Sequence, residues 1–471
     1  MVNEYIINLL KNKLNYTPTA LQEVLIKNLS QYIVNPDDSS IFLIRGYAGT
    51  GKTSLVAALV KVLNDLKLKS VLLAPTGRAA KVLSIYAASP TYTIHKKIYK
   101  QKSLADALSS FSLDRNMHSD TLFIVDEASM IANSSFEQSM FGSGRLLDDL
   151  IRYVKSGKRC KLIVIGDNAQ LPPVGLSISP ALDHHELLVY GSCSETVLSE
   201  VVRQAAGSGI LYNATNIRNQ IEGQDIRLPR ISLANFPDIE SISGAELMEK
   251  LSEAYDYYGN EETMVICRSN RRANRYNSGI RSRILFREEE IEQGDRVMVV
   301  KNNYQSLKDN ELMDFIANGD IARIKRIRKY EERYGIRYVN VSLQFEDYNE
   351  LEIDGKIMLD TLSIETASLP VEKNKELFFA VSEDYAHITP KKKRYNAIRE
   401  DAYFNALQVK FAYAITCHKA QGGQWKCVFL DNPFFKEENI SLEDLRWLYT
   451  AITRTTEKLY LVNFDKNMLI F

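Results

Sequence analysis

The sequence has no surplus of charge of either sign, because Lys plus Arg and Asp plus Glu both total 59 among 471 residues. The total therefore neither favours nor excludes a nucleic-acid partner, since a local basic groove can lie within a neutral chain. Cysteine is also scarce, with five scattered residues and no CxxC pair. This pattern argues against a disulfide framework or an iron–sulfur site and favours reduced thiols.

Internal repeats and low-complexity tracts are missing as well. The N-terminal stretch MVNEYIINLLKNKLNY carries charges and amides throughout, so it predicts neither a signal peptide nor a transmembrane span. We therefore expect a soluble, cytoplasmic protein with no membrane partner. The length, with 45% hydrophobic and 25% charged residues, predicts a globular chain of roughly two to four domains.

Short apolar strands alternate with helical stretches in the first part of the chain. IFLIR, KSVLLA, TLFIVDE and KLIVIGD are continuous apolar runs that end in polar residues or glycine, the pattern of a parallel sheet covered on both faces. Ligands of such sheets bind at the carboxyl ends of the strands. A second alternating region starts near Thr263 and includes FAYAIT, KCVFLD and KLYLVNF. The predicted fold class is therefore α/β.

Two segments interrupt this alternation. Residues 100–120 form a polar insertion without a strong period, where we expect a small excursion. Between about 297 and 407 the pattern changes to period-2 strands joined by turns, in VMVV, IARIKRI, IRYVNVSLQF, LEIDGKIML and KELFFAVS. This pattern predicts a small antiparallel barrel or sandwich.

The stretch RGYAGTGKT lies between the strand IFLI and the helical pattern SLVAALVKVL. Its glycines let the backbone wrap closely around phosphates, and the loop amides and the following helix N-terminus point donors at the anion. Lys52 is expected to reach the β- and γ-phosphates of ATP, and the Thr53 hydroxyl to ligate Mg²⁺. The expected nucleotide-binding residues of the loop are Gly46, Ala48, Gly49, Thr50, Gly51, Lys52 and Thr53.

Two later strand ends carry polar groups for the same site. In TLFIVDEAS, Asp126 is expected to hold Mg²⁺ and Glu127 to orient and deprotonate the attacking water. In KLIVIGDNAQLPPVG, Gln170 is an amide that could sense the γ-phosphate. Taken alone, each stretch also fits a solvated turn, and the phosphate loop is what makes the catalytic interpretation specific.

The order of these stretches resembles a known family. GYAGTGKT, LLAPTGRAAKVL, TIH, FIVDEASM and IGDNAQLPPVG follow the order of helicase motifs I, Ia, Ib, II and III, while LSEVVRQ, AYAITCHKAQGGQW and LYTAITRTTEKLYLV resemble motifs IV, V and VI. From about Thr17 to Val462 the chain resembles superfamily 1 helicases of the 5′-to-3′ branch, close to RecD and Dda, with a UvrD-like C-terminal half.

The resemblance implies two RecA-like motor domains with ATP between them. Motor domain 1A is expected at residues 1–195, with the insertion 1B at 100–120 as a possible strand-separating pin. Motor domain 2A is expected at 196–296 and 408–471, and an SH3-like domain 2B at 297–407.

Further nucleotide contacts follow from the resemblance. Arg203 in LSEVVRQ and Arg454 in TAITRT would neutralise charge on the transferring phosphoryl group from across the cleft. Gln22 lies where the family reads adenine, although its spacing from Thr19 also fits a capping box at the start of a helix from Pro18 to about Val34. Gln424 replaces an acidic residue that approaches the ribose in relatives.

The resemblance also implies single-stranded DNA and DNA forks as partners, bound through phosphate contacts that do not depend on sequence. Phe111 is our candidate for stacking on a base pair at the fork. The arginine-rich stretch from Arg268 to Arg281 could touch phosphate or form a solvated face. The expected nucleic-acid contacts are Pro75, Thr76, Gly77, Arg78, Thr93, His95, Phe111, Thr416, His418 and Lys419.

The leading hypothesis is a monomeric, ATP- and Mg²⁺-dependent motor that moves 5′ to 3′ on single-stranded DNA and opens duplexes. An RNA helicase of the same superfamily is an alternative, because phosphate and stacking contacts do not read the sugar unless a 2′-hydroxyl is checked. A nucleotide-switched interaction protein and a helicase subunit of an exonuclease complex are two others. Any cleavage would then belong to a partner chain, since no appended carboxylate cluster is present.

Overall fold

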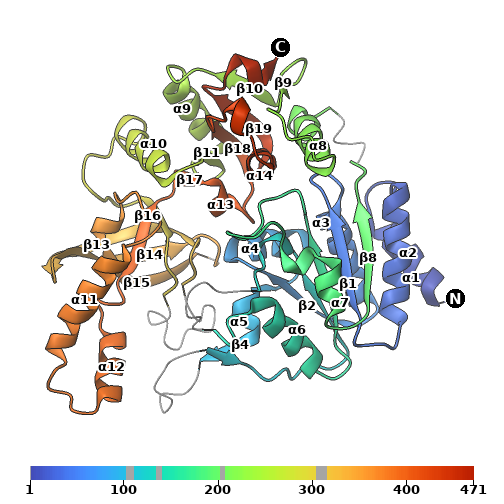
Figure 1. Ribbon diagram of the computed structural model, residues 1–471, viewed down its shortest axis with the longest axis horizontal. Coiled ribbons are helices and arrows are strands. Elements are labelled where there is room, and N and C mark those ends of the chain that lie inside the picture. Colours follow the sequence, from blue (N-terminus) through green and yellow to red (C-terminus); the bar gives the residue numbers. More distant parts are fainter. Residues whose placement is uncertain (1, 102–110, 134–140, 202–206, 304–315, 349) are drawn as a thin grey trace.

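The computed structural model describes residues 2–101, 111–133, 141–201, 207–303, 316–348 and 350–471. They form two parallel-sheet domains and a closed barrel, as the ribbon shows (Figure 1). The predicted fold class, α/β with two parallel-sheet domains and a β-rich insertion in the second, is therefore confirmed. In the described part of the chain, the helices are all too short or too polar to span a bilayer.

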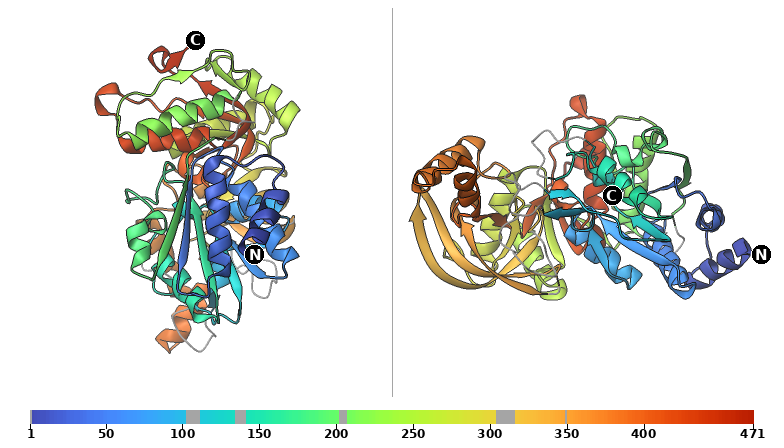
Figure 2. Two further views of the ribbon diagram at one scale, coloured as in Figure 1. Left: turned by 90° about the vertical axis from the view of Figure 1, so that its right-hand side faces the viewer. Right: turned by 90° about the horizontal axis from the view of Figure 1, so that it is seen from below.

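The first motor is built on a six-stranded parallel sheet in the order β3-β2-β6-β7-β1-β8. Its strands are buried on both faces: Leu43 packs into one apolar cluster, and its neighbours Phe42 and Ile44 pack into the cluster on the opposite face. Helices therefore lie on both sides of this sheet (Figure 2). The strands are β1 (Ile41–Gly46), β2 (Lys69–Ala74), β3 (Thr91–Thr93), β6 (Thr121–Val125), β7 (Lys161–Gly166) and β8 (Cys193–Leu198).

Among the described residues of the first motor, seven helices pack around the sheet. The second of them begins with the predicted capping box, in which the Thr19 hydroxyl accepts from the Gln22 N–H and the Gln22 side chain accepts from the Thr19 N–H. These helices are α1 (Val2–Lys13), α2 (Ala20–Val34), α3 (Lys52–Asp65), α4 (Gly77–Ala87), α5 (Ile94–Ile98), α6 (Leu146–Ser156) and α7 (His184–Leu188).

The expected boundary at residue 195 falls inside β8, which pairs with β1 as far as Leu198, so the first sheet extends past it. Of the expected insertion at residues 100–120, residues 102–110 lie outside the described part of the chain. The described part contains a short antiparallel pair formed by β4 (Tyr99–Gln101) and β5 (Phe111–Leu113).

The second motor has a five-stranded parallel sheet in the order β10-β19-β18-β11-β17. Its strands are β10 (Ile239–Ile242), β11 (Thr263–Cys267), β17 (Ala414–Thr416), β18 (Trp425–Asp431) and β19 (Thr455–Val462), and a separate pair is formed by β9 (Ile231–Ser232) and β20 (Leu469–Ile470). Its helices are α8 (Gly209–Glu222), α9 (Leu247–Tyr258), α10 (Asn270–Arg283), α13 (Cys417–Ala420) and α14 (Leu442–Ile452). In Figure 1 the C-terminal strands and α14 complete this domain.

The β-rich insertion is a closed barrel of β12 (Arg296–Val299), β13 (Ile321–Arg333), β14 (Ile336–Phe345), β15 (Leu351–Met358) and β16 (Leu407–Phe411). One predicted strand is wrong: KELFFAVS lies in a helix, α11 (Val371–Asp384), which pairs with α12 (Lys391–Glu400) at the barrel's outer side. The apolar run LFFAV suits either period, and only the burial of Leu377 and Val381, four residues apart, shows the helical face.

Short 3₁₀ turns connect several of these elements. They are η1 (Ala128–Met130), η2 (Pro180–Leu182), η4 (Leu359–Thr361), η5 (Glu437–Asn439) and η6 (Lys466–Met468).

Candidate nucleotide and nucleic-acid site

The phosphate loop joins β1 to α3 at the carboxyl end of the first sheet. Gly49 and Gly51 have φ of +74° and +80°, a left-handed backbone conformation that residues with side chains rarely adopt. The turn that they form leads the backbone into α3. Lys52 begins the helix, and its ammonium group donates to the Tyr47 carbonyl oxygen at 2.8 Å. The lysine is therefore folded over the loop, where an anion bound by the loop amides would meet it.

Asp126 and Glu127 follow β6 at the same edge of the sheet. The Glu127 N–H donates to the Asp126 carboxylate at 2.8 Å, and Glu127 has a left-handed φ of +54° that is unusual for a side-chain-bearing residue. Burial, together with the charge of Glu127, raises the pKa of Asp126 to about 6, while nearby Lys52 acts in the opposite direction. The structure thus brings the two predicted carboxylates and Lys52 into one electrostatic site.

Gln170 lies in the segment that follows β7 and is 6% exposed. Its side-chain oxygen is buried and has no hydrogen-bond partner among the described residues. A buried amide oxygen without a partner is costly, so an acceptor held in this state suits a ligand that supplies a donor, such as water at the γ-phosphate.

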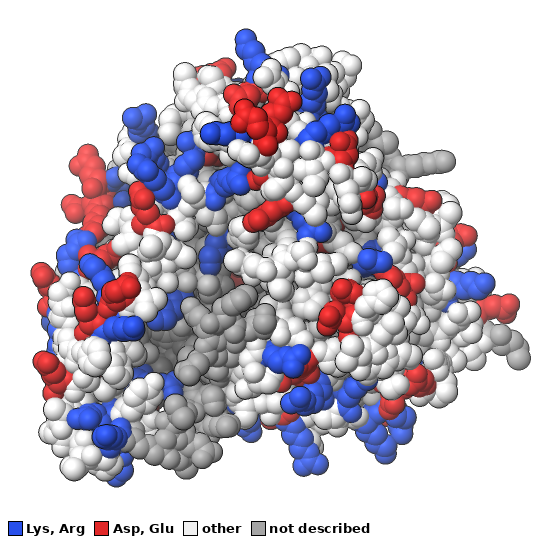
Figure 3. Space-filling view, in the orientation of Figure 1, with Lys and Arg blue, Asp and Glu red and all other residues white. Residues whose placement is uncertain are grey.

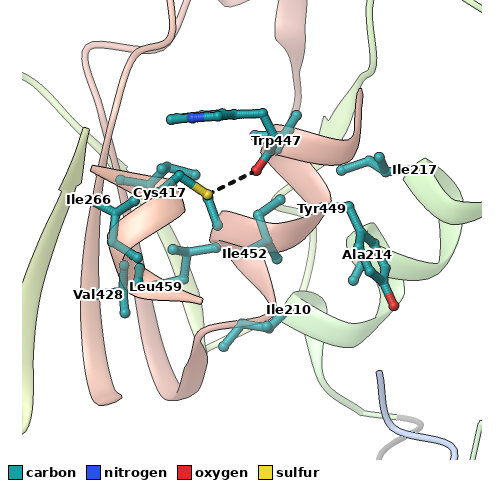
Figure 4. Close-up of a cluster of buried hydrophobic side chains, with 14 of the residues drawn as sticks. Ile210, Ala214, Ile217, Ile266, Cys417, Val428, Trp447, Tyr449, Ile452 and Leu459 are labelled. Atoms are coloured by element: carbon teal, nitrogen blue, oxygen red, sulfur yellow. Dashed lines mark hydrogen bonds between the residues drawn. The ribbon is translucent and has the colours of Figure 1, made fainter. Parts of the chain in front are cut away.

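The second motor makes hydrogen bonds to the segment after β7 at two places, Asp167 and Leu171. The Tyr449 hydroxyl on α14 donates to the Asp167 carboxylate at 2.7 Å and accepts from the Ala48 N–H of the phosphate loop at 2.8 Å. The next residue of α14, Thr450, accepts from the Leu171 N–H through its hydroxyl at 2.8 Å. Figure 4 shows the Tyr449 ring on α14 with its oxygen directed out of the apolar cluster.

Sequence reasoning missed Tyr449 and Thr450. Both stand in LYTAITRT, where the sequence pattern alone points to Arg454. Two polar side chains in succession within WLYTAI, the apolar C-terminal half of α14, just before a predicted catalytic arginine, are the signal that could have indicated them.

Arg454 is 2% exposed and is held inside the second motor. Its guanidinium donates to the carbonyl oxygens of Thr450 and Gly423 at 3.2 and 3.3 Å. These bonds are long, and the described structure places no phosphate-loop group against this arginine. Arg203 lies outside the described residues.

Gln22 is fully buried and its side chain is bonded to the phosphate loop. Its amide nitrogen donates to the Thr50 carbonyl oxygen at 2.8 Å and to the Tyr16 hydroxyl at 3.3 Å, while its oxygen completes the capping box. Both amide donors are therefore engaged, and reading an adenine would require one of these bonds to be exchanged.

The predicted nucleic-acid residues of the first motor lie against the second motor and the barrel. Pro75 and Thr76 link β2 to α4, and the Thr76 hydroxyl caps α4. Arg78 donates to the Gln424 carbonyl oxygen at 3.1 Å, and its guanidinium lies 4.6 Å from the Trp425 ring centroid. Gly77 closely faces the barrel, since an added Cβ would lie 2.4 Å from the Tyr348 hydroxyl.

The second motor contributes its own predicted contacts where β17 ends. Thr416 precedes α13, and its side chain makes no capping bond. Burial lowers the pKa of His418, and it lowers the pKa of Lys419 to about 8. The Lys419 ammonium donates to the Asn318 side chain of the barrel. Lys419 therefore reaches the barrel in this structure.

Thr93 and His95 are placed differently from expectation. The Thr93 hydroxyl caps α5 by accepting from the Lys96 N–H at 3.2 Å. His95 packs against the rings of Phe141 and Tyr99, and burial lowers its pKa to about 4. A neutral imidazole at pH 7 offers no charge to a phosphate group.

Phe111 requires a correction. It is 6% exposed, belongs to an apolar cluster of the first motor, and its ring lies 4.7 Å from that of Phe141. A side chain buried in this way presents no face to a base pair, so the structure does not support its predicted role as a pin.

Comparison with known proteins gives two family matches and several similar helicases. The family described as "AAA domain" matches residues 29–227, and the "UvrD-like helicase C-terminal domain" matches residues 411–462. The ATP-dependent DNA helicase Dda of Enterobacteria phage T4 is 24% identical, over 87% of this chain and 92% of its own length. The ATP-dependent RecD2 DNA helicase of Deinococcus radiodurans is 22% identical, over 89% of this chain and 46% of its own length.

Two further similarities also extend over nearly all of this chain. An uncharacterised protein of Methanocaldococcus jannaschii is 24% identical over 92% of this chain, which spans only 37% of that protein. The solved structure of a Pif1 helicase from Bacteroides, with ADP-AlF3 and single-stranded DNA, has 15% identity and a TM-score of 0.48, covering 97% of this chain and 95% of its own. The predicted resemblance is confirmed: residues 29–227 match the AAA domain family, residues 411–462 match the UvrD-like helicase C-terminal domain, and the similar proteins include the RecD2 and Dda helicases.

Proposed function

We propose that the chain is an ATP-dependent DNA helicase that moves 5′ to 3′ on single-stranded DNA and unwinds duplexes. The observation that carries this proposal is the Tyr449 hydroxyl, which joins the phosphate loop of one motor to a helix of the other. A nucleotide site completed by a second domain can turn hydrolysis into domain motion. The names of the RecD2 and Dda relatives support DNA as the track.

The chemistry follows from the groups around the loop. Lys52 would neutralise the β- and γ-phosphates, and Glu127 would accept the proton of the attacking water. The free oxygen of Gln170 would accept a hydrogen bond from that water and hold it in line. Arg454, and Arg203 by resemblance, would add positive charge once the cleft rearranges around the nucleotide.

The oxygen donors at the site fit Mg²⁺. Thr53 and Asp126 supply a hydroxyl and a carboxylate, and Mg²⁺ prefers one or two such ligands together with phosphate oxygens and water. The raised pKa of Asp126 marks a carboxylate that lacks a cationic partner able to offset its burial. When bound, the ion would neutralise charge on the phosphates.

The nucleic-acid track would run along the strand ends of both motors. Thr76 and Arg78 on the first motor lie beside Gly422 and Gln424 on the second, since an added Cβ on Gly422 would lie 3.0 Å from the Thr76 hydroxyl. Thr416, His418 and Lys419 continue this edge. Contacts of this kind read phosphates and not bases, which suits a motor that moves along any sequence.

The test is the ATPase rate with Mg²⁺, measured with and without an unstructured single-stranded DNA. Strong stimulation by DNA is expected, and an equal mass of single-stranded RNA serves as the competing track. Duplexes with a 5′ or a 3′ tail then determine polarity, and unwinding of the 5′-tailed substrate is expected.

Lys52→Ala is the matched control for the site. Because one charge-assisted phosphate contact is lost from a solvent-lined cleft, turnover should fall by about 100-fold or more while the fold stays intact. Parental turnover in this variant would refute the nucleotide site. A Lys52-dependent rate that ignores DNA would refute the DNA helicase assignment.

A further inference from the structure

The outer face of α10 carries a basic cavity of about 410 Å³. It is lined by Met248 of α9 and by α10 residues between Arg272 and Arg283. The ATP cleft instead lies at α3 and α14, so this cavity is separate from the nucleotide site. In the space-filling view, Lys and Arg side chains gather over α10 (Figure 3).

Two arginines of the cavity are free to meet a ligand. Arg275 and Arg283 are exposed, and the guanidinium group of neither makes a hydrogen bond or ion pair with any residue that the structure describes. They are eight residues apart, so they share one helix face at a separation of about 12 Å along the axis. That spacing suits an elongated anion with several charges better than a single compact one.

A third arginine is fixed at the edge of the cavity. Arg272 is ion-paired with Asp431 through two of its nitrogens, and the Tyr276 hydroxyl also donates to Asp431, at 2.6 Å. The pairing neutralises the charge of Arg272 and holds its position. The net positive charge of the cavity therefore comes from Arg275 and Arg283.

Gly279 lies between the two free arginines, one helical turn from each. Glycine inside a helix makes the helix less stable than alanine would. Packing does not require a glycine at position 279, because an added Cβ would lie 3.4 Å from the Met248 methyl carbon, an ordinary contact. The missing side chain leaves the space between Arg275 and Arg283 open.

The position of α10 links the cavity to the predicted track. α10 begins directly after β11, and the last residue of β11, Cys267, pairs with Thr416 of β17. A single nucleic-acid strand bound at Thr416 can therefore continue along α10 towards Arg275 and Arg283. This continuity favours nucleic acid over an acidic peptide as the occupant.

We propose that the α10 cavity binds the phosphate backbone of a nucleic-acid strand, as a second contact beyond the track between the motors. This inference rests on the proposed function. Arg275 and Arg283 supply the charge, and the open space at Gly279 admits the backbone between them. The contact is independent of base sequence because the cavity offers guanidinium groups and no base-reading surface.

The test measures the dissociation constant of the full chain for single-stranded DNA over a range of salt concentrations. Removing both charges with Arg275→Ala/Arg283→Ala should raise the dissociation constant about tenfold at low salt. The slope of log K against log salt should decrease in magnitude by about 1.4, at about 0.7 per lost phosphate contact. Arg275→Lys/Arg283→Lys keeps the charges and should keep the slope.

The control is Arg227→Ala/Arg230→Ala, which removes the same charge from the exposed loop after α8 and should leave the slope unchanged. Equal slopes for the parent and Arg275→Ala/Arg283→Ala would overturn the inference. So would loss of polyglutamate binding in that variant with the DNA slope intact, since the cavity would then bind acidic protein. A parent chain that binds no DNA would instead refute the proposed function.

Discussion

The Tyr449 hydroxyl accepts a hydrogen bond from the Ala48 N–H at 2.8 Å, although the two residues belong to different motors. The same hydroxyl donates to Asp167, which is 1% exposed. Because Asp167 is buried and Ala48 is partly buried, breaking either bond would leave a polar group with little access to water or to a replacement partner. Any movement of α14 away from the phosphate loop must therefore exchange these bonds, which couples the geometry of the cleft to the loop.

Tyr449→Phe should lower the kcat of the DNA-stimulated ATPase about tenfold and change KM for ATP by less than about threefold. The phenol bonds to the loop only when the motors are together, so its loss should affect the assembled catalytic state more than nucleotide binding. Steady-state kinetics at saturating single-stranded DNA check this expectation.

Tyr255→Phe is the matched control for that substitution. The Tyr255 hydroxyl has no hydrogen-bond partner within the described structure, so its removal should leave kcat at the parental value. If Tyr449→Phe and Tyr255→Phe turn over at the same rate, the hydroxyl of Tyr449 does not position the loop.

The nucleotide half of the site could be predicted because its parts are local in sequence. Lys52, Asp126 and Gln170 each follow a buried strand of one parallel sheet, and the carboxyl ends of such strands meet at one edge. The bond between Tyr449 and Asp167 joins residues 282 positions apart, and it depends on how two domains pack. No spacing or period in the sequence carries that information.

Local patterns also failed where burial decided the outcome. LFFAV was consistent with a strand and with a helix, and tertiary packing selected the helix α11. Phe111 followed a polar stretch that resembled a surface excursion, yet its ring packs into the core of the first motor. In both cases the apolar residues were visible in the sequence, and the surface that covers them was not.

Asp347→Asn should tighten binding of single-stranded DNA about fivefold, the equivalent of about 1 kcal/mol for one charge pair. The Asp347 side chain is 2% exposed and faces Lys81 and Arg78 at 3.5 and 3.9 Å. Neither of its oxygens has a hydrogen-bond partner in the described part of the chain. The barrel thus places an unsatisfied carboxylate against basic groups of the predicted track, in competition with phosphate.

Fluorescence anisotropy with a labelled single strand measures that affinity. Asp360→Asn is the comparison, because Asp360 is also on the barrel but pairs with Arg337. The affinity of the Asp360→Asn variant for single-stranded DNA should equal that of the parent. Weaker binding by Asp347→Asn would show that this carboxylate supports the track and does not compete for it.

Acid should destabilise the first motor through His95. Its pKa in the folded state is about 4, below the value of about 6.5 in an unfolded chain. The unfolded chain therefore binds the proton more tightly, and the stabilising contribution is complete above pH 7 and falls as the pH drops from about 6.5 towards 4. Between pH 7 and pH 5 the loss should be about 2 kcal/mol.

Urea unfolding at pH 7 and pH 5 tests the contribution of His95. His95→Gln has no titrating ring, so the difference between its two free energies of unfolding should be smaller than the parental difference by about 2 kcal/mol. Identical pH dependence in the two proteins would mean that groups other than His95 take up the protons that destabilise the fold.

Phe111→Ala separates burial from a role at the fork. Removing a buried aromatic ring should destabilise the first motor by about 3–5 kcal/mol, because the ring fills space against Phe141 in the apolar cluster. Phe286→Ala, at a ring that is 81% exposed, should change stability by no more than about 0.5 kcal/mol. If Phe111→Ala instead unfolds at the parental urea concentration but loses duplex unwinding with its ATPase intact, the ring leaves the core during the reaction and acts as the pin.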